Sequence, residues 1–114
     1  MSDLLNKKCV PCEGGILPFD ISEIHKYQKK VDGWDVKKNE KRKYFLEKKF
    51  IFKNFINSHN FINRVGEISE GEGHHPDSFF GWGYAKIMIS THAIDGLSEN
   101  DFILAAKIDQ ISNV

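Results

Sequence analysis

The sequence predicts an α+β fold, in which a single four-stranded antiparallel sheet has three helices packed on one face. The apolar residues switch between helical spacing and period-two alternation, in the order α-β-β-α-β-β-α along the chain. The predicted strands are joined in pairs by short turns, so the members of each pair must run antiparallel. Helices that interleave with such hairpins favour one sheet covered on one side.

Length and composition limit the class of protein. A chain of 114 residues has room for one hydrophobic core, and 40% hydrophobic with 28% charged residues is typical of a globular domain. Sixteen basic residues balance sixteen acidic ones, so no overall positive field favours nucleic acid or an anionic membrane. No apolar run approaches the roughly 18–20 residues of a membrane span. We therefore expect no membrane association, no export signal and a cytoplasmic location.

The chain is predicted to divide into a flexible N-terminal arm, residues 1–18, and a single domain, residues 19–114. The arm contains Pro11, Pro18 and Gly14-Gly15, which interrupt any regular pattern without offering an apolar repeat.

Two cysteines, Cys9 and Cys12, have the CxxC spacing within this arm. A thioredoxin-like site would need a βαβ context, and a zinc site would need two further ligands nearby. Packing is therefore the favoured interpretation of the pair, with metal binding and thiol chemistry as the alternatives. The low cysteine count fits a reducing compartment.

The first helix is predicted over residues 20–32. Asp20-Ile21-Ser22-Glu23 has the pattern of a capping box, and apolar residues follow at helical spacing at Ile24, Tyr27 and Val31. Gly33 then provides a stop.

A β-hairpin is predicted next, over residues 34–52 with a turn at Asn39-Glu40. Its second strand repeats apolar residues with period two, at Tyr44, Leu46, Phe50 and Phe52. Tyr44 or Phe50 on the sheet face that the helices leave open would form an exposed apolar patch. We therefore expect a homodimer or homotetramer, built through the sheet or its edge strands.

The second helix is predicted over residues 54–70, with Asn54 as its N-cap and its end at Gly71 or Gly73. A second hairpin follows, with strands at residues 79–82 and 84–92. The last strand presents one face made of Ala85, Ile87, Ile89 and Thr91.

The third helix, over residues 98–111, has the clearest local signal. Ser98 is its expected N-cap, Asp101 occupies the N3 position of a capping box, and Leu97 with Phe102 forms a hydrophobic staple.

The residues that could carry chemistry gather after the second helix. Glu70, His74 and His75 lie at its end, and His92 ends the last predicted strand. Imidazole has an unperturbed pKa of about 6.5, so three histidines in one cleft would form a proton-transfer site. A helix C-terminus and nearby carboxylates stabilise the charged imidazolium, which favours a general acid. Pro76 restricts His75 to an extended conformation, so the adjacent imidazoles point in different directions.

These residues also have simpler explanations. A pair of histidines in a loop is often a solvated surface feature, and a histidine at a strand end is often merely packed or exposed. Three histidines could bind zinc, but directly adjacent ones rarely converge on one ion, so we expect no metal. Helix capping explains Asp101 as well as a role in the site does.

These residues follow one another at fixed spacings. Three residues separate Glu70 from His74-His75-Pro76, and five more separate Pro76 from Trp82. Nine residues then separate Trp82 from His92, and eight separate His92 from Asp101. This pattern resembles the signature of the pterin-4a-carbinolamine dehydratase family. The resemblance covers nearly the whole chain, since it extends to the segments Lys8–Gly15, Gly33-Trp34, Phe50–Lys53, Thr91-His92 and Gly96–Glu99.

The resemblance implies a 4a-hydroxytetrahydrobiopterin dehydratase, a lyase that removes water from a 4a-hydroxytetrahydropterin to give the quinonoid dihydropterin. This reaction recycles the cofactor of aromatic amino-acid hydroxylases. The elimination moves protons but no electrons, so no metal or other cofactor is expected. The family's fold, a four-stranded antiparallel sheet with three helices on one face, agrees with the element order above.

The resemblance also implies roles for individual residues. His74, His75 and His92 would be catalytic, with Glu70 orienting or charging His74. The pterin pocket would run along His74–Pro76 and Thr91–Ile94, and the implied substrate-binding residues are Pro76, Trp82, Thr91, Ala93, Ile94 and Asp101. The chain differs from familiar members at Ser78, Ala93 and Asp95, which bears on pocket shape and substrate preference.

Two other functions compete with a dehydratase. Relatives in this family also resemble protein partners that stabilise transcription-factor dimers, so a binding module with little catalysis is the main alternative. Residues 37–53 hold eight Lys or Arg against only Glu40 and Glu47, which would suit an acidic protein or nucleic acid. A solvated hairpin explains these charges better, so we do not expect nucleic-acid binding. The second alternative is a metal-dependent hydrolase.

Overall fold

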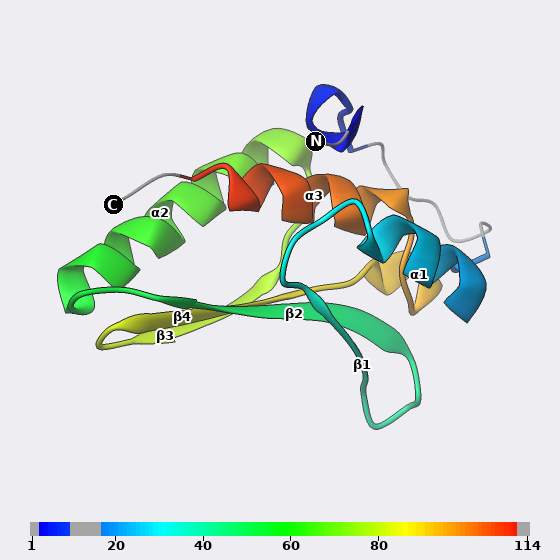
Figure 1. Ribbon diagram of the computed structural model, residues 1–114, viewed down its shortest axis with the longest axis horizontal. Helices are drawn as coiled ribbons and strands as arrows, with labels where there is room; N and C mark the ends of the chain where they lie inside the picture. Colours follow the sequence, from blue (N-terminus) through cyan, green and yellow to red (C-terminus); the bar gives the residue numbers. More distant parts are fainter. Residues whose placement is uncertain (1–2, 10–16, 112–114) are drawn as a thin grey trace.

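The computed structural model describes residues 3–9 and 17–111 and confirms the α+β fold (Figure 1). The strands are β1 (Asp35–Lys38), β2 (Tyr44–Ile51), β3 (Asp77–Gly81) and β4 (Tyr84–Ile89). They form one sheet in the order β1-β2-β4-β3, in which all neighbours are antiparallel. The helices are α1 (Ile21–Gln28), α2 (Phe55–Glu72) and α3 (Glu99–Asp109), with short 3₁₀ turns η1 (Asp3–Asn6) and η2 (His92–Ile94).

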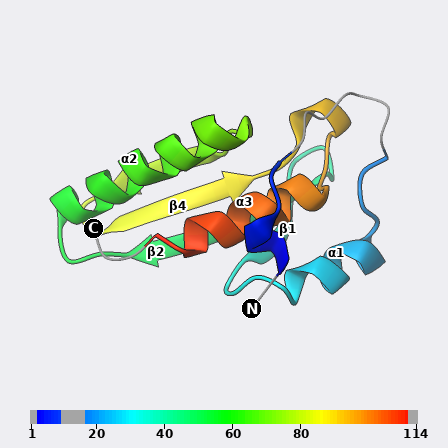
Figure 2. The same ribbon diagram turned by 90° about the horizontal axis from the view of Figure 1, so that it is seen from above.

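All three helices lie on the same side of the sheet. Viewed from above in Figure 2, α2 and α3 run side by side, and α1 lies beyond α3. α3 is the centre of the core, because every residue from Asn100 to Ala106 is buried on it. Within residues 3–9 and 17–111, no helix is long and apolar enough to cross a membrane.

The helix caps form as the sequence predicts. The Asp20 carboxylate accepts a hydrogen bond from the Glu23 N–H at 2.9 Å, and Asn54 caps α2 through the N–H of Asn57 at 2.9 Å. Ser98 and Asp101 form the capping box of α3. These contacts satisfy backbone donors that the first turn of a helix leaves without partners.

The first helix is shorter than the predicted range of 20–32. α1 ends at Gln28, whose side-chain amide donates to the carbonyl of Trp34 at 2.9 Å. The bond links the end of α1 to the residue before β1, and Gly33, with φ of 75°, lies in the turn between them.

The expectation that Tyr44 or Phe50 forms an exposed patch is wrong. Both residues pack against the core on the face that the helices cover, and the Phe50 ring centroid lies 4.6 Å from that of Phe61 on α2. Because side chains alternate along a strand, the open face carries the intervening residues instead. Its exposed apolar side chains are Ile51, Phe79 and Tyr84.

The last strand also ends earlier than predicted. β4 stops at Ile89, and Thr91 forms an isolated bridge with Gly96, in which the Thr91 N–H donates to the Gly96 carbonyl at 2.8 Å. His92 therefore begins the turn η2 and does not lie in the strand. The predicted buried face of Ala85, Ile87, Ile89 and Thr91 is confirmed.

The first described residues pack on the body of the protein. Leu4 of η1 is fully buried against α3, and Cys9 is buried next to α3. Cys12 and the glycine pair at 14–15 lie outside the described residues. The division of the chain at residue 18 stays a prediction.

Candidate active site

A cavity of about 220 Å³ lies where the end of α2, the end of β4 and the start of α3 meet. Its walls contain all three histidines of the predicted site, from two segments that are 17 positions apart in the sequence. The lining residues are Gly73, His74, His75, Ser90, Thr91, His92, Ala93 and Asn100. The fold therefore brings His92 to the adjacent pair His74 and His75.

The end of α2 fixes the position of His74. Gly73 has φ of 67°, and its N–H donates to the Glu70 carbonyl while the His74 N–H donates to the Ser69 carbonyl. These two bonds form a Schellman motif, in which the left-handed residue is usually glycine. The histidine directly after the helix is therefore held in one backbone position.

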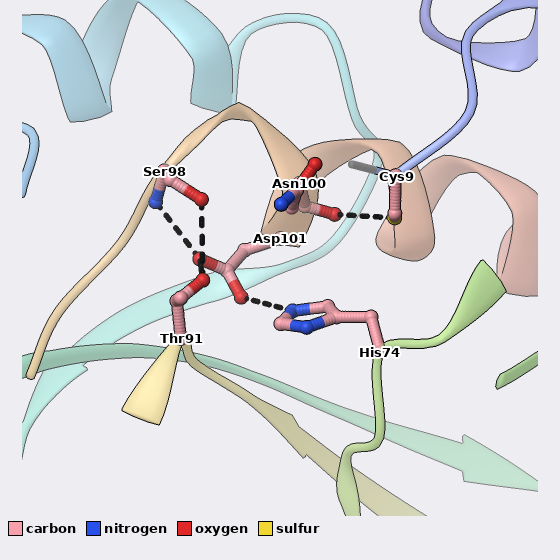
Figure 3. A network of polar contacts seen from close by, with 6 residues as sticks. All are labelled: Cys9, His74, Thr91, Ser98, Asn100 and Asp101. Carbon is pink, nitrogen blue, oxygen red and sulfur yellow. Dashed lines mark hydrogen bonds and ion pairs between the residues drawn. The ribbon is translucent and has the colours of Figure 1, made fainter. Parts of the chain in front are cut away.

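His74 is paired with Asp101. Its Nε2 lies 2.7 Å from Oδ1 of Asp101, as Figure 3 shows. The His74 side chain is 12% exposed and the Asp101 side chain is fully buried. A buried carboxylate that accepts from Nε2–H fixes the orientation of this imidazole and leaves its Nδ1 to exchange a proton with a ligand.

The second oxygen of Asp101 is also fully engaged. Its Oδ2 accepts hydrogen bonds from the Thr91 hydroxyl and the Ser98 N–H, both at 2.8 Å (Figure 3). Asp101 thus caps α3 and also holds the imidazole of His74. With both oxygens occupied and no exposure, it does not reach the cavity itself.

His75 points in a different direction from His74, as the sequence predicts. Its Nε2 lies 2.5 Å from Oε1 of Glu70, and both side chains are exposed. The expectation that Glu70 orients His74 is therefore corrected: Glu70 pairs with His75 at the exposed edge of the cavity, whereas His74 pairs with the buried Asp101.

His92 is presented by a compact loop. Thr91 anchors the loop through its bridge to Gly96 and through its hydroxyl bond to Asp101. The exposed imidazole of His92 makes no hydrogen bond or ion pair with any described residue. Its ring nitrogens are free to contact a ligand in the cavity.

The structure leaves some predicted substrate-binding residues away from the cavity walls. Trp82 lies in the turn between β3 and β4, at the opposite end of that hairpin from the histidines, and is 71% exposed. Pro76 and Ile94 are adjacent in sequence to lining residues without lining the cavity themselves. Of the predicted set, Thr91 and Ala93 line it.

Sequence reasoning missed three lining residues: Gly73, Ser90 and Asn100. Ser90 could have been found, because it is the polar residue on the strand face opposite to Ile89 and directly precedes Thr91. Nothing in the sequence around Asn100 indicates a place in the cavity wall, apart from its position in the first turn of α3. Among the described residues, no group of three His, Cys, Asp or Glu side chains has the arrangement of a metal site.

A second polar network, made of Cys9, Glu72 and Lys107, contacts the cavity-lining residue Asn100. The Cys9 thiol lies 3.4 Å from the Asn100 carbonyl, and the Cys9 N–H donates to Oε1 of Glu72 at 2.8 Å. Burial, and then the negative charge of Glu72, raises the pKa of the Cys9 thiol to about 12. Hydrogen bonds from Lys107 and from the Cys9 N–H outweigh the effect of burial and lower the pKa of Glu72. Cys9 is therefore a protonated, packed thiol.

These observations define a class of protein. It is a small α+β domain in which the end of α2, the end of β4 and the start of α3 together form a site with three histidines. The comparison with family models identifies it further, since residues 18–111 match the family described as pterin 4 alpha carbinolamine dehydratase. The chain belongs to this family.

Relatives of similar length support the assignment. A protein of Rubrobacter xylanophilus is 45% identical over 111 residues, which cover 97% of this chain and all of the relative. A protein of Halorhodospira halophila is 45% identical over 108 residues, covering 95% of this chain and 96% of the relative. Both carry the name "Putative pterin-4-alpha-carbinolamine dehydratase".

Solved structures share the fold. A transcriptional coactivator/pterin dehydratase from Brucella melitensis aligns with a TM-score of 0.71 at 26% identity, over 81% of this chain and 95% of that one. A pterin dehydratase-like protein, identified as a RuBisCO assembly factor in the alpha-carboxysome, aligns with a TM-score of 0.57 at 24% identity. The alignment covers 68% of this chain and 86% of that protein, and at this identity the likeness concerns the fold alone.

Proposed function

We propose that the protein is a 4a-hydroxytetrahydropterin dehydratase that uses the three histidines of the cavity for general acid and base catalysis. The observation that carries the proposal is the convergence of His74, His75 and His92 on one cavity, with His74 backed by the buried carboxylate of Asp101. Membership in the pterin-4-alpha-carbinolamine dehydratase family supports the choice of substrate.

The proposed reaction breaks the C4a–O bond of the substrate. The leaving hydroxyl accepts a proton and departs as water, the N5–H proton is removed, and the N5 electron pair forms the new C=N bond. The reaction therefore needs an acid at the hydroxyl on C4a and a base at N5, the two atoms that the new double bond joins.

His74 is suited to one of these two roles, because the hydrogen bond to Asp101 fixes the tautomer and orientation of its imidazole. His92 is suited to the other, since its imidazole has no protein partner within the described residues and lines the same cavity. His75, paired with Glu70 at the exposed rim, would position the substrate or assist the proton transfer. The product would return to tetrahydropterin recycling in the cytoplasm.

The experiment is a direct dehydration assay. A synthetic 4a-hydroxytetrahydropterin is mixed with the protein, and the decay of its ultraviolet absorbance is compared with the uncatalysed decay. We expect acceleration proportional to protein concentration. Decay at the uncatalysed rate, with protein shown to be folded by circular dichroism, would contradict the proposal.

A binding module is the second candidate, because one solved relative is described as a transcriptional coactivator/pterin dehydratase. The feature of this chain that favours it is an exposed apolar region at the end of the molecule away from the histidines. The exposed apolar side chains there are Phe55 and Ile56 at the start of α2 and Trp82 in the turn between β3 and β4. A partner bound there would leave the cavity accessible, so the two functions are compatible.

A further inference from the structure

Three consecutive residues near the N-terminus, Lys7–Cys9, form a strap across the junction between the end of α2 and the start of α3. On the α3 side, Lys7 Nζ lies 2.7 Å from Oε2 of Glu99, and the Cys9 thiol donates to the Asn100 carbonyl at 3.4 Å (Figure 3). Glu99 and Asn100 are the first two residues of α3, and Asn100 lines the histidine cavity. The strap therefore holds the turn of α3 that forms part of the cavity wall.

The strap also holds the last turn of α2. Lys8 Nζ donates to the Gly71 carbonyl at 2.7 Å, and the Cys9 N–H donates to Oε1 of Glu72 at 2.8 Å. The second oxygen of Glu72, Oε2, accepts a hydrogen bond from Lys107 Nζ of α3 at 2.7 Å. Glu72, the last residue of α2, is therefore bonded to the strap and to α3 at the same time.

These contacts fix the two helix ends that carry the pair of His74 and Asp101. The His74 N–H donates to the Ser69 carbonyl, so the backbone of His74 moves with the last turn of α2. Asp101 lies in the first turn of α3. The two side chains are 2.7 Å apart, and a hydrogen bond is lost beyond about 3.5 Å. A displacement of one helix end by about 1 Å would therefore separate the pair.

We propose that the strap and Glu72 position His74 against Asp101, and that Glu72 is a positioning residue that acts on the reaction through His74. The inference rests on the proposed function and adds to it residues that lie outside the cavity walls. Although burial raises the pKa of Glu72, the hydrogen bonds from Lys107 and the Cys9 N–H lower it overall. Glu72 is therefore a carboxylate at neutral pH and accepts both bonds in its charged form.

The last residue of α3, Asp109, provides a matched control. Its carboxylate accepts hydrogen bonds from Lys48 Nζ at 2.8 Å and from Trp34 Nε1 at 3.0 Å, so it binds one lysine and one N–H, as Glu72 does. The Asp109 side chain is 15% exposed, and that of Glu72 is 12% exposed. The partners of Asp109 lie on β2 and before β1, and none of them lines the histidine cavity. Asp109→Ala and Glu72→Ala should therefore lower the melting temperature similarly, whereas only Glu72→Ala should disturb His74.

The first measurement observes the imidazole of His74 and requires no turnover. Long-range hydrogen–nitrogen NMR correlation spectra at alkaline pH show which nitrogen of each neutral histidine carries the proton, and the spectrum of His74→Gln assigns the His74 signals. The hydrogen bond that one ring nitrogen makes decides the tautomer. We expect a single His74 tautomer, protonated on Nε2, in the wild type and in Asp109→Ala. Glu72→Ala should show a mixture of both tautomers.

The second measurement is steady-state dehydration of a 4a-hydroxytetrahydropterin at a temperature where all variants are folded. The kcat of Glu72→Ala should fall by roughly 10- to 10²-fold, as for a catalytic group held about 1 Å out of place. Its KM should stay close to the wild-type value, because Glu72 does not line the cavity. Glu72→Gln retains an oxygen for the Cys9 N–H, so its kcat should lie between those of Glu72→Ala and the wild type. Asp109→Ala should keep the wild-type kcat.

Lys8→Met makes the test independent of whether Glu72→Ala folds. It removes the bond to Gly71 from an exposed side chain, and it should also produce the mixture of tautomers and lower kcat, by less than Glu72→Ala does. A single Nε2–H tautomer in Glu72→Ala overturns the proposal, as does the same result in Lys8→Met where Glu72→Ala is unfolded. A fall in kcat that Asp109→Ala matches also overturns it.

Failure of this inference can be distinguished from failure of the dehydratase proposal. If the wild type does not accelerate dehydration, the dehydratase proposal fails, and the tautomer of His74 in the variants alone decides whether the strap and Glu72 position this residue. If the wild type is active and Glu72→Ala keeps its kcat, the role of Glu72 in the reaction is overturned while the dehydratase proposal stands.

Discussion

His74 and Asp101 lie 2.7 Å apart across the junction between the end of α2 and the first turn of α3. The contact couples helix capping to the site, because the same carboxylate accepts the Ser98 N–H of the capping box. A substitution at Asp101 therefore acts on two measurable properties, which respond differently to different replacements.

Asp101→Asn and Asp101→Ala should separate these properties. Asparagine retains an oxygen for Ser98 but presents an N–H₂ group to His74, which reverses the favoured tautomer of the imidazole. We expect turnover to fall by roughly 10²-fold in both variants. Asp101→Ala should in addition lose about 0.5–2 kcal/mol of stability through the missing cap. Thermal melting and turnover are measured on the same samples. Full activity in Asp101→Asn would show that the carboxylate serves the cap alone.

Gly73 should be needed to hold His74 in place. Its φ of 67° strains an alanine by roughly 1 kcal/mol, although no neighbouring atom lies in the space of the added Cβ. We expect Gly73→Ala to lower both the melting temperature and turnover. Gly73→Asn is the control, since asparagine tolerates this conformation, and its losses should be smaller. Equal effects of the two substitutions would argue against backbone strain as the cause.

The cysteines should be dispensable for catalysis. Cys9→Ser and Cys12→Ser should each retain near wild-type dehydration, because the proposed elimination involves no redox step. With a pKa of about 12, the Cys9 thiol is ionised to only ~10⁻⁴ at pH 8, so it should resist alkylation by iodoacetamide in the native state. A large fall in turnover in a folded Cys→Ser variant would contradict this interpretation.

The raised pKa of the Cys9 thiol should make the free energy of unfolding depend on pH. Its folded pKa lies above the ordinary value of 9.0, so the folded state binds the proton more tightly than the unfolded state does. The resulting stabilisation is complete below pH 9 and decreases as the pH rises from 9 toward 12. Denaturant unfolding at pH 8 and pH 10.5 should show a smaller alkaline loss in Cys9→Ser than in the wild type. An identical alkaline loss would contradict the raised pKa.

The open face of the sheet should form an interface between copies of the chain. Ile51 is 73% exposed there and lies beside Tyr84 of β4. We expect a dimer or tetramer in light scattering at micromolar concentration, and Ile51→Lys should lower the mass. Ile56→Lys, on α2, is the control for position. A monomeric wild type would contradict the prediction, and dissociation by Ile56→Lys alone would place the interface on α2.

Features set by local sequence could be predicted. The caps at Asp20, Asn54 and Ser98 depend on residues within one helical turn, and the element order follows from periodicity. The early ends of α1 and β4 could not be predicted in this way. At these ends the chain makes contacts that the local pattern does not encode, the bond from Gln28 to Trp34 and the bridge from Thr91 to Gly96.

The three histidines of the site could be predicted, but their pairings and part of the cavity wall could not. The spacing of histidines and Asp101 indicated that these residues belong together, but His74 and Asp101 are separated by 27 positions. Only the packing of α2 beside α3 decides that Asp101 faces His74 while Glu70 faces His75. A cavity of about 240 Å³ on the open face of the sheet could not be predicted from the sequence either. Its walls come from three separate segments: the turn between β1 and β2, the start of β3 and the loop after β4.

The central claim is that the three histidines carry the reaction, and turnover of their single alanine variants tests it most directly. His74→Ala, His75→Ala and His92→Ala are compared with the wild type in the dehydration of a 4a-hydroxytetrahydropterin, with melting temperature as the control for folding. We predict that turnover falls by roughly 10²-fold or more in each variant, as for a lost general acid or base. The melting temperature should stay close to that of the wild type in His75→Ala and His92→Ala, whose side chains are exposed. It should fall in His74→Ala, because that variant leaves the buried Asp101 carboxylate without its partner, so circular dichroism checks that this variant is folded at the assay temperature. Near wild-type turnover in all three variants, in a protein whose wild type is active, would contradict the claim.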